Sequence, residues 1–329
     1  MPVVAPMPLA TEPQQTREEV MAPPSRFADK AFEWLTLAMA LMVVVLVLLV
    51  GWQLGRGSYF SIKKFGFHFL ATSTWDPVAE QFGALPFIYG TIVSSIIALV
   101  IAVPLSIATA VYLTELAPLW IRQPLTSLIE MLAAIPSVIL GLWGIFVMIP
   151  WLRDYPFPWL KHYFAWTGLF TGPIYGVCML AGGIIIAIMI LPIITSVSRE
   201  ILRSVPDLQR EAAYALGATR WEVTRIAVLS YAKRGIFGAV ILGLGRALGE
   251  TMAVTMVIGN TPQIAASLFA PGYTLASVIA NEFTEATSDL YLQALFEIGL
   301  VLFGITILAN LAGQLLLRTL KNSTASRGA

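Results

Sequence analysis

The chain has 329 residues, of which 57% are hydrophobic and 12% charged, and its mean hydropathy is +0.79. This composition excludes an ordinary soluble domain, and a net charge of +1 gives no basis for nucleic-acid binding. The single cysteine, Cys178, excludes a disulfide framework, and two distant histidines argue against a histidine-based metal site. No Gly-Lys dipeptide occurs, so the chain lacks a P-loop, and any ATP that drives it must bind another chain. No cofactor is expected.

In chain order, residues 1–30 come first, with six prolines among small and polar residues. They predict a disordered tail, and they lack the order of charge, apolar core and cleavage site that a signal peptide requires. Apolar runs long enough to cross a bilayer follow. They predict an all-α integral membrane protein whose domain covers residues 31–320, with a second tail at 321–329. The six expected spans lie at about 33–54, 86–112, 126–149, 174–196, 235–258 and 293–317.

Proline residues inside the expected spans, Pro104, Pro136 and Pro192, predict kinks that neighbouring helices can satisfy. Two outer segments connect the spans. The mixed segment 55–85 is expected to fold against the outer mouth of the bundle. The segment 150–173 is rich in aromatic residues, which favours a place in the headgroup belt. Contact of this segment with an external binding protein is the alternative.

Lysine and arginine residues predict the orientation of the spans, because cytoplasmic loops carry an excess of them. With both termini inside, five fall in outer segments: Arg56, Lys63, Lys64, Arg153 and Lys161. Fourteen fall in inner segments: Arg17, Arg26, Lys30, Arg122, Arg199, Arg203, Arg210, Arg220, Arg225, Lys233, Arg234, Arg318, Lys321 and Arg327. The bias places the polar stretch at residues 205–230 on the cytoplasmic side.

The stretch 205–230, called the coupling hairpin below, has the pattern of a helix–turn–helix. Pro206 suits a first helical position and Asp207 favours the positive end of a helix dipole. Gly217 stands where a left-handed cap would end the first helix. Thr219-Arg-Trp-Glu222 predicts a capping box that starts a second short helix. A DNA-binding motif has similar spacing, but the flanking spans would hold it against the bilayer. A purely structural loop is a further alternative.

Arg246 and Glu250 are the most informative residues within the expected spans. Four positions apart on a helix, they are predicted to share one face. Each charge costs roughly 2.5–3.5 kcal/mol at the centre of an inserted helix, so the pair must face protein or water. Gly245 and Gly249 would let another helix approach closely. The arginine presents a planar fork of donors that matches a tetrahedral oxyanion. A structural ion pair between helices is the alternative.

Other polar residues in or near the spans have simpler explanations. Glu130 near the inner end of the third span, Glu297 near the outer end of the sixth, and Asn310 are expected to snorkel or to hydrogen-bond between helices. Glu115 falls at the inner end of the second span and requires no special explanation.

The coupling hairpin resembles a known motif. Glu211-Ala212-Ala213, three further residues and Gly217 are similar to the cytoplasmic EAA loop in membrane-spanning subunits of bacterial ABC importers. In that family the loop docks on the ATPase subunit. The resemblance therefore implies an ATPase-coupling role for Glu211, Ala212, Ala213 and Gly217.

The fifth span narrows the resemblance. Residues 246–260, with Arg246-Ala-Leu-Gly-Glu250, are similar to permease subunits of the high-affinity phosphate ABC importer. Residues 83–91, 130–137 and 280–283 resemble the first of its two permeases. This implies the type I importer permease fold, a place in the bacterial inner membrane and passage of phosphate past Arg246 and Glu250. The implied partners are a second permease, two ATPase subunits, a phosphate-binding protein and membrane lipid. A sulfate or molybdate permease and a membrane-embedded enzyme remain alternatives.

Overall fold

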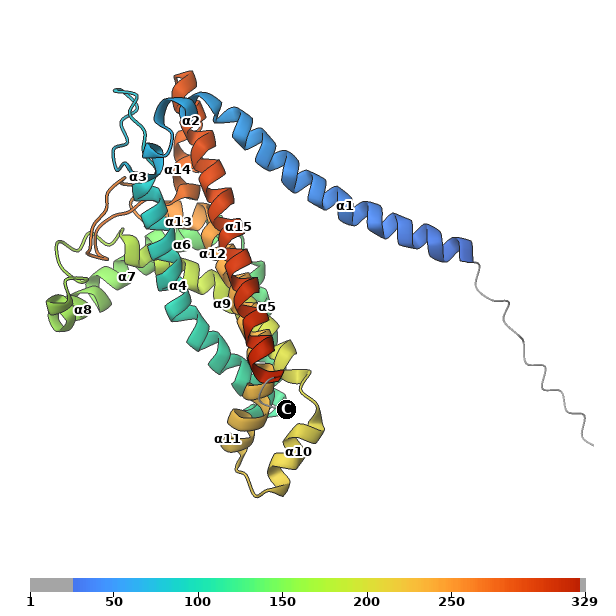
Figure 1. Cartoon of the computed structure of the whole chain (residues 1–329). Coiled ribbons are helices and arrows are strands. Elements are labelled where there is room, and N and C mark those ends of the chain that lie inside the picture. The colour runs from blue at the N-terminus through green and yellow to red at the C-terminus, as the bar shows by residue number, and fades with distance from the viewer. Residues whose placement is uncertain (1–25, 326–329) are drawn as a thin grey trace, which may run out of the picture. The chain divides into compact units, whose positions relative to one another are not determined.

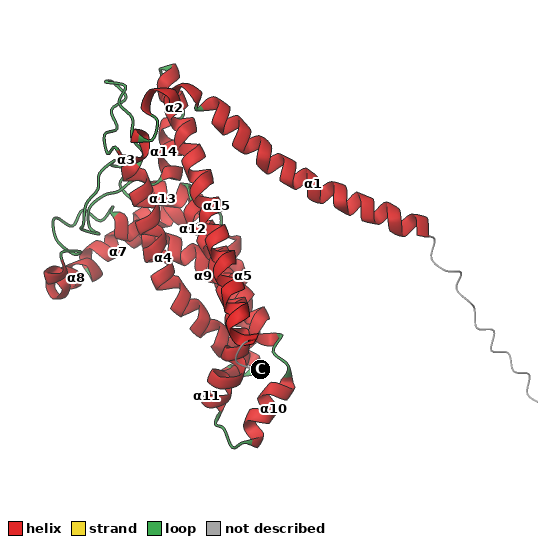
Figure 2. Cartoon of the chain, in the orientation of Figure 1, coloured by secondary structure: helices red, strands yellow, loops and turns green. Residues whose placement is uncertain are grey.

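The computed structural model describes residues 26–325, and within them helices account for all regular structure (Figure 2). Long apolar stretches explain this architecture, because a helix satisfies its own backbone hydrogen bonds in a bilayer. Six stretches of the described chain are long and apolar enough to cross a membrane, which confirms the predicted number of spans. Their bounds are Asp29–Gly57, Leu85–Leu116, Ser137–Asp154, Met179–Arg203, Arg220–Gly249 and Asp289–Arg318.

The chain divides into two compact units, residues 1–50 and 51–329. Most of α1, Arg26–Gly57, belongs to the first unit, and its large apolar side chains between Leu35 and Val50 are exposed. A helix that is apolar on all sides is typical of a membrane span. Within the described part of the chain, residues 26–30 are helical and α15 continues to Ala325. Residues 1–25 and 326–329 of those tails lie outside the described residues.

The centre of the second unit is formed by α4 (Leu85–Val111), α9 (Met179–Arg203) and α12 (Ser230–Gly249). Small residues allow these helices to pack closely. Gly183 of α9 lies against Ile97 of α4, and a Cβ on Gly243 of α12 would lie 2.7 Å from Ile194 of α9. The main apolar core, with Ile185, Ile186 and Ile190 of α9 fully buried, lies around this contact.

The third span is interrupted where the sequence predicts a kink. The segment α5 (Leu119–Ala134) ends before Ile135 and Pro136, whose backbones are extended, and α6 (Ser137–Trp143) begins directly after them. The π-helical turn η2 (Gly144–Met148) and α7 (Ile149–Asp154) complete this span. The third span therefore lies at Ser137–Asp154 rather than at 126–149. The reason is that Pro136 separates two helices instead of bending a continuous one.

The remaining elements lie at the two ends of the second unit or run between these ends (Figure 1). One end carries α2 (Tyr59–Phe65) and α3 (His68–Ala71), and the opposite end carries α10 (Asp207–Ala215) and α11 (Arg220–Glu222). Between them run α13 (Met252–Val257), α14 (Leu275–Glu282) and α15 (Asp289–Ala325). The rest are α8 (Pro156–Phe164), η1 (Tyr112–Leu116), η3 (Ala165–Thr167) and η4 (Val223–Leu229).

Residues 55–85 fold onto the bundle at the α2 end. Phe69, Phe82 and Phe87 are buried there together with Tyr291 of α15. The Trp75 indole N–H and the Tyr291 hydroxyl both donate to Glu282 Oε2, at 2.7 and 2.6 Å. Nearby, burial raises the pKa of Tyr273, whose hydroxyl accepts a hydrogen bond from the Asn281 amide. These contacts fix the long outer segment to α14 and α15.

Candidate functional site

Arg246 lies in the last turn of α12 and its side chain is exposed on the surface of this chain. Within residues 26–325, no carboxylate lies within 4.0 Å of its guanidinium. A cation in a membrane span cannot be left facing lipid without a large free-energy cost. The guanidinium must therefore meet water, an anion or another protein chain on that surface.

Glu250 lies directly after the end of α12, in a break in the fifth span formed by Glu250 and Thr251. The backbone of Glu250 is extended, with φ −68° and ψ 127°, and the helix resumes as α13 at Met252. The prediction that Arg246 and Glu250 share one continuous helix is wrong. The break follows two glycines, Gly245 and Gly249, which weaken a helix, and it frees backbone N–H groups at the start of α13.

The carboxylate of Glu250 lies near these N–H groups. The side chain is buried, with 9% of its surface exposed. The groups that act on it are the positive charge of Arg246, the backbone N–H groups of Ala253 and Thr251, and the Ser137 hydroxyl. An acidic group near the first turn of a helix also interacts favourably with the helix dipole. Glu250 is thus held at the break, whereas Arg246 is free to bind outward.

Ser137 reaches Glu250 because two interrupted spans cross at this point. Ser137 is the first residue of α6, directly after the break at Pro136. Gly141 of α6 packs on Met256 and Ala253 of α13, so closely that a Cβ would collide. The sequence analysis missed Ser137 as a site residue. The signal was the Pro-Ser pair, which marks a helix start at membrane depth.

The two glycines before Glu250 have different surroundings. A Cβ on Gly245 would lie 3.7 Å from Asn310 Oδ1, so α15 passes this position as the small-residue pattern predicts. A Cβ on Gly249 would meet no atom of the described chain within 4 Å. Gly249 therefore extends the open surface around Arg246.

The coupling hairpin has the predicted helix–turn–helix form. Its first helix, α10, begins at Asp207, and Pro206 precedes the helix with an extended backbone rather than occupying the first helical position. Glu211 and Ala212 are exposed and Ala213 is half-buried. Gly217 has φ +80°, which confirms the left-handed cap. Because a Cβ there would meet no atom of this chain within 4 Å, only the backbone conformation requires glycine.

The second arm of the hairpin is longer than predicted. The Thr219–Glu222 capping box is present, with the Thr219 backbone N–H donating to Glu222 at 2.8 Å. The helix that begins there does not stop but continues through η4 into α12, so Arg220–Gly249 is one span. The apolar face of the following residues explains this continuity: Val223 is buried, and Val228 is buried in a cluster with residues of α4 and α9. The hairpin is thereby joined directly to the helix that carries Arg246.

Arg210 attaches the first arm of the hairpin to two spans. Its guanidinium pairs with Glu115 of η1 at 3.0 Å and donates to the Leu202 and Val205 carbonyls at 3.0 and 2.6 Å. Only 18% of the Arg210 side chain and 14% of the Glu115 side chain are exposed. Five donors in a planar fork allow one arginine to make all these bonds. The sequence analysis gave Glu115 no partner, because the two residues lie 95 positions apart.

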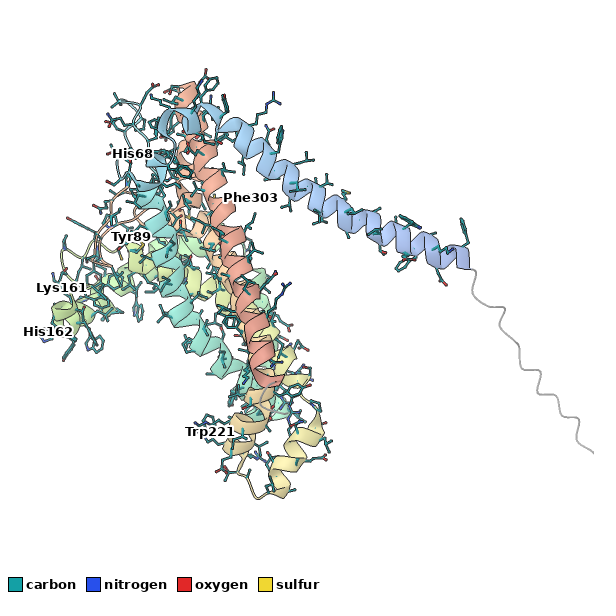
Figure 3. All side chains as sticks on the ribbon, viewed as in Figure 1. His68, Tyr89, Lys161, His162, Trp221 and Phe303 are labelled. Atoms are coloured by element: carbon teal, nitrogen blue, oxygen red, sulfur yellow. The ribbon has the colours of Figure 1, made fainter. Side chains whose placement is uncertain are left out.

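A second ion pair ties α9 to the third span. Arg199 pairs with Glu130 of α5 at 3.2 Å and with Glu200 at 3.0 Å, and only 10% of its side chain is exposed. The expectation of an inter-helix bond at Glu130 is confirmed. In contrast, His68 on α3 and His162 on α8 lie far apart (Figure 3). Across residues 26–325 no group of three or more His, Cys, Asp or Glu side chains could hold a metal ion.

Comparison with known proteins assigns the chain to a class. The family described as binding-protein-dependent transport system inner membrane component matches residues 102–322. A chain of a bacterial ABC transporter involved in the import of the acidic polysaccharide alginate aligns with a TM-score of 0.57. That alignment has 16% identity and covers 89% of this chain and 98% of the other. A chain of the inward-facing MetNI methionine ABC transporter aligns with a TM-score of 0.50 and 20% identity, covering 72% and 94%. The chain is a membrane permease subunit with the type I ABC importer fold.

Closer relatives narrow the class. The phosphate transport system permease protein PstC of Mesorhizobium japonicum is 50% identical over 86% of this chain and 88% of its own length. PstC of Haemophilus influenzae is 45% identical over 90% and 95%, and a probable PstC of Methanocaldococcus jannaschii is 37% identical over 86% and 91%. The chain belongs to the family of PstC phosphate transport permeases.

Proposed function

We propose that this permease moves inorganic phosphate across the cytoplasmic membrane, past the exposed guanidinium of Arg246. The observation that carries the proposal is a chain in the PstC family with one exposed, unpaired cation beside a break in a membrane span. A planar guanidinium binds a phosphate oxyanion through two parallel hydrogen bonds. Glu250 offsets part of the arginine charge when no anion is bound.

The subunit works by alternating access, driven by ATP hydrolysis on a separate chain. In this proposal Glu211, Ala212, Ala213 and Gly217 dock the coupling hairpin into a groove of an ATPase subunit. Exposed apolar side chains around them support such a contact: Leu208, Leu216 and Trp221 are 74%, 90% and 62% exposed. Since α11, η4 and α12 form one span, displacement of the hairpin moves Arg246, about 39 Å along the same helix.

The complete importer contains a homologous second permease, two ATPase subunits and an extracytoplasmic phosphate-binding protein. The second permease would complete the pathway opposite Arg246, on a surface that this chain leaves exposed. The excess of inner lysine and arginine residues supports an orientation with both termini in the cytoplasm. In that orientation the coupling hairpin faces the ATPases, and α2, α3 and α8 face the outside.

The test is uptake of radiolabelled phosphate by cells that lack their own high-affinity importer. The chain is co-expressed with the subunits that are found to co-purify with it. Uptake of phosphate is then measured with and without excess sulfate or molybdate. Phosphate uptake that resists both competitors is expected. Uptake of sulfate or molybdate in preference to phosphate would reject the substrate, and co-purification without an ATPase chain would reject the mechanism.

A further inference from the structure

One face of α15 carries polar side chains within the sixth span. Thr306, Asn310 and Gln314 follow one another at intervals of four residues, so successive members are only about 40° apart around the helix. Leu308 stands about 160° away from Asn310 and is 67% exposed, as a side chain that faces lipid would be. The span therefore has an apolar face and a separate polar face.

Asn310 is the member of this polar face that needs an explanation. Within residues 26–325 its amide makes no hydrogen bond, and neither polar atom of the amide is fully buried. If the sixth span is centred on a hydrocarbon layer of about 30 Å, Asn310 lies about 5 Å inside the boundary nearer Arg318. An amide without a partner in hydrocarbon costs roughly 2–7 kcal/mol. The Asn310 amide must therefore meet water, a ligand or another chain.

The neighbouring helix α12 carries an open strip beside Arg246. Leu242 is 55% exposed and Gly249 is exposed, and a Cβ on Gly238 or Gly249 would meet no atom of the described chain within 4 Å. These three residues, called the glycine strip below, fall between Arg246 and Gly245 around the helix. Arg246 and Gly245 thus form the two edges of the strip, about 100° apart.

The two edges of the glycine strip adjoin different helices. Near the Arg246 edge, a Cβ on Gly243 would lie 2.7 Å from Ile194 of α9. At the Gly245 edge, Asn310 Oδ1 would lie 3.7 Å from a Cβ on Gly245. Because consecutive Cα atoms are about 3.8 Å apart, this Oδ1 atom is at most about 9 Å from the Arg246 Cα. A long arginine side chain and one oxyanion can bridge that distance across the strip.

Arg246 and Asn310 offer complementary chemistry to a protonated oxyanion. A guanidinium only donates hydrogen bonds, whereas an amide donates through Nδ2 and accepts through Oδ1. Near neutral pH, phosphate presents acceptor oxygens and a P–OH donor, but sulfate presents acceptors only. The Asn310 amide can therefore exchange both kinds of hydrogen bond with phosphate and can only donate to sulfate.

We propose that Asn310 is a second phosphate contact and a selectivity-determining residue, which faces Arg246 across the glycine strip. The inference rests on the proposed passage of phosphate past Arg246, and it adds a contact from the sixth span. Gln314 is exposed one turn further along α15 and continues the polar face toward the proposed cytoplasmic end.

The first experiment asks whether position 310 meets water and the anion. The full chain and its co-purifying subunits, in lipid nanodiscs, carry either Asn310→Cys or the matched control Leu308→Cys on the opposite face of α15. The native Cys178 is buried. A negatively charged methanethiosulfonate reacts with thiolates that water reaches, so Asn310→Cys should react at least about tenfold faster than Leu308→Cys. Inorganic phosphate should slow the reaction of Asn310→Cys.

The second experiment measures what the amide contributes to binding. The reporter is Gly249→Cys, because a Cβ at this exposed position meets no neighbour. The phosphate concentration that halves its reaction rate is compared with and without Asn310→Leu, which removes both polar atoms at similar volume. Asn310→Leu should raise that concentration about 3- to 10-fold, with a smaller rise for sulfate. Arg246→Ala in the same reporter should abolish protection by phosphate.

The outcomes separate this inference from the proposed function. Equal protection with and without Asn310→Leu would overturn the inference, and so would an Asn310→Cys thiol as unreactive as that of Leu308→Cys. Loss of the co-purifying subunits in Asn310→Leu would show instead that the amide bonds another chain. These results would leave the role of Arg246 intact, because Arg246→Ala tests it separately. Absence of any phosphate protection in Gly249→Cys would overturn both.

Discussion

Two arginines, one in the coupling hairpin and one in the fifth span, have opposite surroundings. Arg210 in the coupling hairpin is nearly buried and donates to Glu115, Leu202 and Val205. Arg246 at the break of the fifth span is exposed and has no ion pair in the described chain. A satisfied arginine fixes the elements it joins, whereas an unsatisfied one is available to a ligand. In the proposed mechanism, this difference separates the part of the subunit that would transmit motion from the part that would bind the anion.

Substitution of Arg246 tests the binding side of this comparison and should have the largest effect. Arg246→Ala removes the cation of the pathway and should reduce phosphate uptake at least about 100-fold, because hydrogen bonds to charged groups contribute roughly 1.5–3 kcal/mol each. Arg246→Lys keeps the charge and loses the planar fork, so uptake should fall about 10-fold. Radiolabelled phosphate uptake is the measurement. The ATPase should still co-purify with both variants; uptake at the parent rate would assign Arg246 to structure alone.

Substitution of Arg210 tests the transmitting side. Arg210→Ala releases α10 from Glu115 and from the end of α9, and it leaves Glu115 partly buried without its partner. We expect about a tenfold fall in phosphate transported per ATP hydrolysed, with ATP hydrolysis itself retained. Both rates are measured in the same proteoliposomes. A parallel fall in transport and hydrolysis would show that Arg210 only stabilises the fold.

The matched control for Arg210 is Arg203. Its contact with Glu200 is 3.6 Å long, and the two side chains are 45% and 61% exposed. Exposed pairs contribute about 0–1 kcal/mol, so Arg203→Ala should leave the coupling ratio within about twofold of the parent. The coupling ratio of Arg210→Lys should lie between those of Arg210→Ala and Arg203→Ala, because lysine can pair with Glu115 but cannot also reach both carbonyls.

How far the sequence predicts these two regions depends on whether the signal is local. The left-handed Gly217 and the Thr219–Glu222 capping box were predictable, because both depend on residues within four positions of each other. The pairing of Arg210 with Glu115 joins segments 95 positions apart, and one sequence contains no signal for it.

The break at Glu250 escaped prediction for a related reason. The segment from Gly243 to Val257 is largely apolar, and none of its three glycines stands at the break itself. The contacts at the break are tertiary: Ser137 acts on the Glu250 side chain and Gly141 of α6 packs on α13, across more than 100 positions of chain. Pro136 did predict the corresponding break in the third span, because the proline ring fixes the backbone locally and removes an N–H donor.

Substitution of Gly217 tests whether the coupling hairpin requires its left-handed turn as well as the contacts of Arg210. At φ +80°, a β-branched residue is strained by roughly 1–3 kcal/mol. Gly217→Val should therefore weaken ATPase co-purification at least about fivefold, while the chain still inserts into the membrane. Gly217→Asn is the control, because asparagine tolerates this conformation. If valine and asparagine variants retained the ATPase equally, the turn would not determine docking.

Glu250 should give the smallest effect, and it decides how selectivity arises. A carboxylate exposed to the anion would accept a hydrogen bond from monohydrogen phosphate and repel sulfate, which has no proton to donate. Glu250 is instead buried, and Ser137, Thr251 and Ala253 already supply its donors. A glutamine there must turn its amide N–H₂ toward at least one of those donors. We therefore expect Glu250→Gln to loosen the break and to lower phosphate uptake about 2- to 5-fold.

Competition by sulfate then separates the two roles of Glu250. If the carboxylate acts by holding the break and the Arg246 helix end, sulfate should remain as poor a competitor in Glu250→Gln as in the parent. Ser137→Ala should reproduce a weaker form of the same defect, because it removes one of the donors without changing any charge. The assay must not depend on the external binding protein, since that protein can reject sulfate before it reaches the permease. Stronger inhibition by sulfate in Glu250→Gln alone would show that the carboxylate meets the anion directly.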